Sequence, residues 1–228
     1  MKPPNRVCAL VSGGLDSCVM LAELAKRHAK VYPVFIQQGL IWETTELRYL
    51  RRFLRALDAS TLQRFNALTL LSLPVRDLYG AHWSITGKNV PHAATPDEAV
   101  YLPGRNLLLL SKAAVFCAAR GIPTIAVGSL GHNPFPDATP KFFRDFSRTA
   151  GAALRFKFQI VAPFRSLSKA QVIRRGKNLP LHLSFSCLAP RPAGRGQHCG
   201  HCNKCAERQR AFREAGVFDQ TRYRRRGH

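Results

Sequence analysis

The chain has 228 residues, of which 46% are hydrophobic and 9% aromatic, so it can bury one core and is not disordered over most of its length. Its net charge of +22 favours phosphate, nucleotide or nucleic-acid partners, either as a weak RNA or DNA affinity or simply as a solvated basic face. No apolar run approaches the ~20 residues of a membrane span, and residues 1–6 lead into a strand without a signal-peptide core, so we expect a cytoplasmic protein without membrane contact.

Apolar runs alternate with helical patterns along the chain, which predicts an α/β fold with a doubly wound parallel sheet. In chain order, we expect strands over Val7–Val11, Val31–Ile36, Leu68–Val75, Thr124–Val127 and Gln159–Ala162. The expected helices cover Ser17–His28, Glu43–Leu57, Asn106–Arg120, Phe142–Leu154, Ser168–Lys177 and Cys205–Ala215. We divide the chain into an α/β domain at 1–180 and a C-terminal segment with a basic tail at 181–228.

Helix caps and loops give the next expectations. Asn106 and Ser168 are each expected to cap the helix that they begin. The stretch from Asp77 to Leu102 has no sustained period, and a loop of this length predicts a functional element such as a lid. Ligands in such sheets bind beyond the carboxyl ends of the strands. Four segments follow predicted strands and should face one crevice: the Ser12 turn, Gln37–Gly39, Asp77 and Gly128–Asp137.

The sequence Ser-Gly-Gly-Leu-Asp-Ser at 12–17 lies between the first strand and the first helix. Its glycines let backbone N–H groups turn inward, its serines add hydroxyl donors, and the helix N-terminus adds partial positive charge. The spacing is neither a Walker A loop nor a dinucleotide fingerprint. It resembles the pyrophosphate loop of N-type ATP pyrophosphatases, with an ordinary strand–turn–helix corner as the alternative. The predicted nucleotide-binding residues are Leu10, Val11, Ser12, Gly13, Gly14, Leu15, Asp16, Ser17, Cys18 and Val19.

Four of the seven cysteines, Cys187, Cys199, Cys202 and Cys205, are close together near the C-terminus. Their C-x11-C-x2-C-x2-C spacing suits four thiolates around a tetrahedral, structural Zn²⁺. A histidine, His198 or His201, replacing one ligand, a redox relay and an iron–sulfur cluster are the alternatives. The other three cysteines, Cys8, Cys18 and Cys117, lie in apolar segments and are expected to pack in the core.

Three segments occur together: the 12–17 loop, Pro-Gly-Arg-Asn-Leu-Leu-Leu-Leu-Ser at 103–111, and the late cysteines. In this order they resemble the 7-cyano-7-deazaguanine synthase family of the N-type ATP pyrophosphatase (PP-loop) superfamily, nitrile-forming ligases of queuosine biosynthesis. Pro136-Asp137 and Ser168-Lys169-Ala170 extend the resemblance, which covers nearly the whole chain. It implies an adenine nucleotide alpha hydrolase-like sheet with a C-terminal zinc-bound helical appendage. It also implies an enzyme that uses ATP, ammonia and 7-carboxy-7-deazaguanine.

The chain departs from the family pattern at a few positions. Gln38-Gly39-Leu40 stands where the family carries Gln-Arg-His, Ala138 replaces a cysteine, and Ser129-Leu-Gly-His132 replaces acidic residues. The first gap in the cysteine cluster is also longer than usual. These changes fall where the acceptor would be bound, so a different carboxylate or purine-like acceptor is an alternative.

Four side chains are the candidate catalytic residues. Asp16 is expected to contact Mg²⁺, or else to cap the first helix. Arg105 could clamp phosphate or carboxylate, or carry a surface charge. Asp137 could orient substrate or move protons, or be a solvated loop carboxylate, and Lys169 could reach phosphate or be exposed. In the implied reaction, ATP adenylates the carboxylate, ammonia then gives an amide, and a second activation with dehydration gives the nitrile.

Two other functions use parts of the same pattern. An enzyme that transfers sulfur to tRNA shares the pyrophosphate loop and would use the basic surface, but it usually needs a reactive cysteine in the crevice. A non-catalytic zinc module that binds nucleic acid fits the charge and the cysteines but leaves the 12–17 loop unexplained. A homodimer is compatible with every one of these functions.

Overall fold

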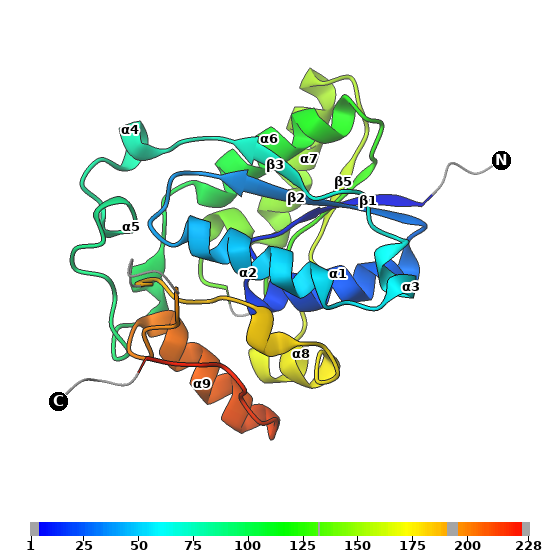
Figure 1. Ribbon diagram of the computed structural model, residues 1–228. Coiled ribbons are helices and arrows are strands. Elements are labelled where there is room, and N and C mark those ends of the chain that lie inside the picture. Colours follow the sequence, from blue (N-terminus) through cyan, green and yellow to red (C-terminus); the bar gives the residue numbers. More distant parts are fainter. Residues whose placement is uncertain (1–4, 132, 191–195, 225–228) are drawn as a thin grey trace.

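The computed structural model describes residues 5–131, 133–190 and 196–224 (Figure 1). Within these ranges, five strands form one parallel sheet in the order β3-β2-β1-β4-β5. The strands are β1 (Arg6–Leu10), β2 (Lys30–Gln37), β3 (Thr69–Ser72), β4 (Thr124–Ala126) and β5 (Gln159–Val161). The predicted doubly wound α/β sheet is confirmed. β3 is shorter than predicted because Pro74 lacks the N–H group that would continue the ladder.

Helices cover both faces of the sheet (Figure 1). They are α1 (Leu15–Arg27), α2 (Glu43–Arg55), α3 (Ala59–Leu62), α6 (Arg105–Ala118), α7 (Pro140–Ala153), α8 (Lys169–Arg175) and α9 (Asn203–Ala215). Neighbouring residues of β1 point to opposite faces, so Val7 packs with α1 and α2 while Cys8 packs with α6 and α7. The predicted core positions of Cys8, Cys18 and Cys117 are confirmed. Among the described residues, no helix combines the length and apolar character that crossing a bilayer requires.

The two predicted helix caps have different outcomes. Ser168 caps α8 as predicted: its Oγ accepts from the Gln171 N–H, and the Gln171 side chain accepts from the Ser168 N–H. Asn106 does not cap α6, because Gly104, at φ +68°, is the N-cap residue. Asn106 lies in the first turn instead, where its backbone N–H donates to the Asp137 carboxylate. A carboxylate distant in sequence therefore takes over the capping role.

The stretch from Asp77 to Leu102 was expected to lack regular structure, and that expectation is wrong. It contains α4 (Arg76–Tyr79), α5 (Trp83–Thr86) and a 3₁₀ turn, η1 (Asp97–Val100). These turns are too short to give a helical period in the sequence. Ile85, Val100 and Leu102 pack in a third core with Phe185 and the four clustered cysteines. The stretch thereby joins the C-terminal segment to the sheet.

Gly13 sets how closely α2 approaches the 12–17 loop. Its φ is +78°, and a Cβ there would lie 2.7 Å from the Glu46 carbonyl oxygen. Gly39 has a φ of +80° with nothing within 4 Å, so it is the matched control. Gly39→Ala should lose about 1–2 kcal/mol of unfolding free energy because of its backbone conformation. Gly13→Ala should lose about 1–3 kcal/mol more through the clash, measured by urea unfolding. Equal losses would contradict the close approach of α2.

Candidate active site

Two cavities, of about 460 and 230 Å³, meet at the 12–17 loop. The smaller one lies at the carboxyl ends of β1, β2 and β4, against Leu10, Ile36 and Val127. The larger one extends toward α9 and the cysteine segment, against Trp42, Phe135 and Phe185. The residues lining both are Ser12, Gly14, Asp16, Glu46, Arg105, Asn106, Gly128, Ser129 and Asn133. The 12–17 loop therefore lies at the junction of the two cavities, and a molecule that occupied both would contact it.

Two of the four segments predicted to face one crevice line it, namely the Ser12 loop and much of the stretch from Gly128 to Asp137. His132 lies outside the described residues. The segment Gln37–Gly39 lines neither cavity, so its predicted place in the crevice is wrong; Gln38 is buried and its Oε1 accepts from Arg105 Nε, which is a cavity residue, at 2.9 Å. Asp77 lines neither cavity, so that prediction is wrong. β3 is the edge strand, and the chain turns into α4 after it rather than toward β1.

The predicted nucleotide-binding residues divide into two groups. Leu10, Val11, Ser12, Gly14, Leu15, Asp16 and Ser17 line at least one of the cavities. Gly13 packs on α2 instead, and Cys18 and Val19 lie in the core beneath the loop. Within the loop, the Ser17 Oγ donates to the Gly14 carbonyl at 2.9 Å, and the Gly14 N–H donates to Ser12 Oγ at 3.2 Å. No side chain caps the N-terminus of α1, so its first N–H groups can bind an anion.

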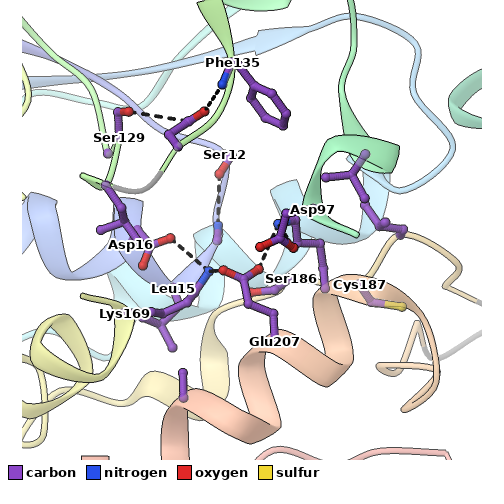
Figure 2. Close-up of a pocket in the computed structure, with 18 of the residues that line it drawn as sticks. Ser12, Leu15, Asp16, Asp97, Ser129, Phe135, Lys169, Ser186, Cys187 and Glu207 are labelled. Atoms are coloured by element: carbon purple, nitrogen blue, oxygen red, sulfur yellow. Dashed lines mark hydrogen bonds and ion pairs between the residues drawn. The ribbon is translucent and has the colours of Figure 1, made fainter. Parts of the chain in front are cut away.

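Three charged side chains from three helices meet beside the loop (Figure 2). Lys169 Nζ lies 3.2 Å from Asp16 Oδ2 and 2.9 Å from Glu207 Oε1. Burial lowers the pKa of Lys169, but the two carboxylates outweigh that effect and hold the pKa above its usual value. Burial likewise raises the pKa of Glu207, but Lys169 and Lys204 lower it to about 2. Lys169 and Glu207 are therefore both charged at neutral pH, and Lys169 is neither exposed nor unpaired.

Asp16 keeps one oxygen unused in this arrangement. Its Oδ1 is buried and has no hydrogen-bond partner among the described residues, while Oδ2 pairs with Lys169. Gly14, and not Asp16, is the N-cap residue of α1, so the capping alternative is not supported. An unpaired carboxylate oxygen beside an uncapped helix N-terminus has the chemistry of a ligand for a hard cation.

Arg105 and Asp137 face the larger cavity from the start of α6 and from the loop after β4. The Asp137 carboxylate accepts from the Asn106 backbone N–H at 2.8 Å and from Asn106 Nδ2 at 3.2 Å. Through these hydrogen bonds Asp137 fixes the first turn of α6. Because Arg105 belongs to that turn, Asp137 also keeps Arg105 at the cavity. Asp137 is buried, so the alternative of a solvated loop carboxylate is wrong.

Glu46 is a site residue that the sequence reasoning missed. It is 8% exposed and lines both cavities, yet its carboxylate makes no hydrogen bond or ion pair with any described residue. Burial raises its pKa well above the usual value, although the nearby Arg105 partly opposes the shift. The missed signal was its position at helical spacing on the apolar stripe of α2, with Leu50 and Phe53. A carboxylate on a buried stripe needs a partner.

The unpaired Glu46 predicts a stability effect that depends on pH. Because its folded-state pKa is raised, its ionisation opposes folding as pH increases above 4.5 toward that raised value. In protein without ligand, Glu46→Gln should therefore match or exceed the wild-type thermal midpoint. Its advantage should grow between pH 4.5 and 7, by about 1.4 kcal/mol for each unit of pKa shift.

Glu43 supplies the matched control on the same helix. Its carboxylate accepts from the Gln38 and Gly39 N–H groups, both at 2.7 Å. Burial raises the pKa of Glu43 as well, and the two N–H groups oppose the shift. Glu43→Gln leaves one of these N–H groups without its acceptor, so it should lower stability at pH 7 by about 1–3 kcal/mol. If Glu46→Gln destabilised the protein as Glu43→Gln does, Glu46 would have a partner within the protein.

The four clustered cysteines could hold a metal ion. All four are buried, and their Sγ atoms lie within 4.8 Å of one another. Sγ atoms in a tetrahedral zinc site are about 3.8 Å apart, given Zn–S bonds of about 2.3 Å. The Cys199–Cys205 and Cys187–Cys202 separations are 3.9 and 4.0 Å. Hydrogen bonds among the four thiols lower the pKa of Cys199 and Cys202 and raise the pKa of Cys187 and Cys205, so without a metal the cluster favours thiolates at only two of its positions.

The two histidines of this segment have other partners. His198 Nε2 accepts from the Ser186 N–H at 3.2 Å, and burial lowers the pKa of His198 to about 3. His201 Nδ1 lies 2.8 Å from the Cys199 carbonyl oxygen. Neither ring belongs to the group of ligand atoms, so a histidine ligand is not supported.

Two sequence comparisons with known proteins agree on one family. The model of the family described as "Queuosine biosynthesis protein QueC" matches residues 6–216. The 7-cyano-7-deazaguanine synthase of Syntrophobacter fumaroxidans is 31% identical over 236 residues, which covers 96% of each chain. That of Anaeromyxobacter dehalogenans is 31% identical over 235 residues, again with 96% of each chain covered. A solved 4-thiouridine synthetase–RNA complex with bound ATP matches in fold alone, at 15% identity and a TM-score of 0.51, over 93% of this chain and 50% of that one.

Proposed function

Because the chain belongs to the family of the queuosine biosynthesis protein QueC, we propose that it converts 7-carboxy-7-deazaguanine and ammonia into 7-cyano-7-deazaguanine with ATP. Such a protein is an ATP-dependent carbon–nitrogen ligase. One observation carries the proposal: the family match at 6–216 coincides with two cavities that join at an uncapped helix N-terminus. The reaction needs two adjoining binding sites, one for the nucleotide and one for the planar acceptor, and the two joined cavities provide them.

The reaction must give an inert carboxylate a leaving group. A carboxylate oxygen attacks the α-phosphorus of ATP, the bond to the bridging oxygen breaks, and pyrophosphate leaves. Ammonia then attacks the carbonyl carbon and AMP departs with the original carboxylate oxygen, which gives the amide. A second ATP activates the amide oxygen in the same way, and loss of AMP and a proton gives the nitrile.

The residues around the loop have defined tasks in this scheme. The N–H groups at the start of α1 stabilise charge on the departing pyrophosphate. Arg105, held by Gln38, contacts phosphate or the acceptor carboxylate. Lys169 shares its charge between Asp16 and Glu207 and lies close enough to the loop to meet the polyphosphate. Asp137 acts by holding the start of α6.

Two metal ions are part of the proposal. The unused Asp16 Oδ1 fits Mg²⁺, which when bound neutralises phosphate charge. The four cysteines fit Zn²⁺ in a closed structural site that would hold residues 187–205 together, where the cysteines pack on Val100 and Leu102. We propose a cytoplasmic location, which suits cysteines that serve as thiols or metal ligands rather than in disulfides. Weak RNA or DNA affinity and a homodimer stay predictions, and part of the basic tail, Arg225 and Arg226, lies outside the described residues.

The two other functions are less well supported. Of the described cysteines, Cys187 alone lines either cavity, and it belongs to the four-thiol group, so a sulfur-transfer enzyme lacks a separate reactive thiol here. A nucleic-acid-binding module without catalysis would not explain the two cavities or the ion pairs that Lys169 makes beside them. Mass spectrometry of the products from ATP, ammonia and 7-carboxy-7-deazaguanine, without RNA, tests the proposal. The nitrile with AMP and pyrophosphate is expected, whereas turnover that requires tRNA, or no turnover, would contradict it.

A further inference from the structure

We propose that Glu46, Trp42 and Trp83 form the subsite that recognises the guanine-type ring of the acceptor. The Glu46 carboxylate accepts from the ring N–H and the adjacent exocyclic amine, while the ring lies against the two tryptophans. This inference rests on the proposed function, because it assigns the part of the same site that binds the acceptor.

The first argument is the unmet need of Glu46 for a partner. A buried carboxylate without donors costs several kcal/mol, so a protein retains one where a ligand supplies them. Glu46 is 8% exposed, lines both cavities and has no side-chain partner among the described residues. Glu43, one turn earlier, already accepts two backbone N–H groups. The Glu46 carboxylate therefore opens to the cavities with its acceptor capacity free for the N–H groups of a bound molecule.

The second argument concerns the kind of donor. Two adjacent N–H groups on one edge of a flat ring match the two oxygens of a carboxylate, as a guanidinium does. Arg105 lies close enough to Glu46 to act on its charge, and this positive group disfavours a second cation there. Asp16 instead has the free oxygen that a hard cation requires. Neutral N–H donors suit Glu46 better than a metal ion does.

The third argument is the aromatic surface beside Glu46. Trp42 and Trp83 stack with their ring centroids 5.5 Å apart at 25°, and both line the larger cavity. Glu46 lies one helical turn after Trp42, since its N–H bonds the Trp42 carbonyl oxygen. Because the two rings cover each other's facing sides, the cavity is bounded here by the rest of the pair, and this apolar wall next to a carboxylate suits a fused bicyclic ring whose polar groups are on one edge. The 7-carboxylate, on the opposite side of that ring, then points away from the like charge of Glu46.

The two tryptophans are the only ones in the chain, so intrinsic fluorescence reports this wall directly. Wild type titrated with 7-carboxy-7-deazaguanine, without ATP, should show a saturable change. Glu46→Gln should weaken this binding by roughly ten- to a hundredfold, which is the usual range for a paired base contact. The KM for the acceptor should rise similarly, while the KM for ATP should stay within about twofold. Asp145→Asn on exposed α7, away from both cavities, is the control and should bind as wild type does.

A second ligand tests the contact without altering the protein. 7-Carboxy-7-deazahypoxanthine lacks the exocyclic amine, so it should bind wild type at least about tenfold more weakly than the acceptor. In Glu46→Gln, the two ligands should differ much less. Equal binding of both ligands by wild type, unchanged acceptor binding in the variant, or a rise in the KM for ATP alone would overturn the inference while the synthase function stands. A wild-type protein that neither binds nor converts the acceptor would refute the synthase function and the subsite together.

Discussion

Asp16→Asn is expected to reduce ATP-dependent turnover by about 10²–10³-fold while the fold is retained. The substitution removes the charge at the unused Oδ1 and also breaks the ion pair between Oδ2 and Lys169. Both effects act where the polyphosphate would lie, so kcat should fall for pyrophosphate release and for nitrile formation together. Release of pyrophosphate in the presence of acceptor and ammonia is the measurement.

Glu23→Gln is the matched control, because Glu23 is a carboxylate on the same helix, α1, that pairs with Lys26 and lines neither cavity. Its turnover should equal that of wild type. Circular dichroism and the thermal midpoint separate a loss of chemistry from a loss of folding. Near-normal turnover in Asp16→Asn would remove the loop carboxylate from the mechanism.

Cys199→Ser is expected to lose the metal ion that we propose for the cysteine cluster and to loosen the C-terminal segment. Three remaining thiols cannot close a tetrahedral site, and the binding free energy of a structural metal contributes directly to folding. The cysteines share a core with Phe185, Val100 and Leu102, so the loss should spread into the stretch before α6. Metal analysis together with amide hydrogen exchange in α9 measures the effect. Cys117→Ala, in the core beneath α6, is the control and should keep the metal.

Metal loss should also affect the chemistry indirectly. α9 carries Glu207, which holds Lys169 beside Asp16 (Figure 2). A loosened α9 would leave Lys169 without one of its two partners, so activity should fall together with hydrogen-exchange protection. If Cys199→Ser lost activity while zinc content and α9 protection were fully retained, the cluster would have a chemical rather than a structural role.

Local patterns in the sequence were sufficient for much of the molecule. β1 is apolar throughout because Val7 and Cys8 are buried on opposite faces of the sheet, so a short apolar run predicted a parallel strand. The cysteine cluster was also predictable, because three of its members lie within seven residues and a turn alone brings them together. The 12–17 loop was recognisable because its motif is continuous in the sequence and lies between a strand and a helix.

Features that depend on contacts between residues far apart in the sequence could not be predicted from local sequence patterns. The cap of α6 comes from Asp137, a residue 31 positions away, and so Asn106 was assigned the wrong role. Lys169 meets Glu207 across 38 residues, which no local spacing indicates. For Glu46, the helical spacing with Leu50 and Phe53 indicated burial, but only the structure shows the cavities that its carboxylate faces. Residues 77–102 fold mainly against the cysteine segment, which is far away in sequence.

The most direct test of the central claim follows the oxygen atoms of the acceptor. 7-Carboxy-7-deazaguanine labelled with ¹⁸O in its carboxyl group is turned over with ATP and ammonia, and the nucleotide products are analysed by mass spectrometry. If the loop holds ATP for adenylation of the acid, each AMP should carry one ¹⁸O atom and pyrophosphate should carry none. Label in inorganic phosphate, or its release into water with unlabelled AMP, would contradict the account.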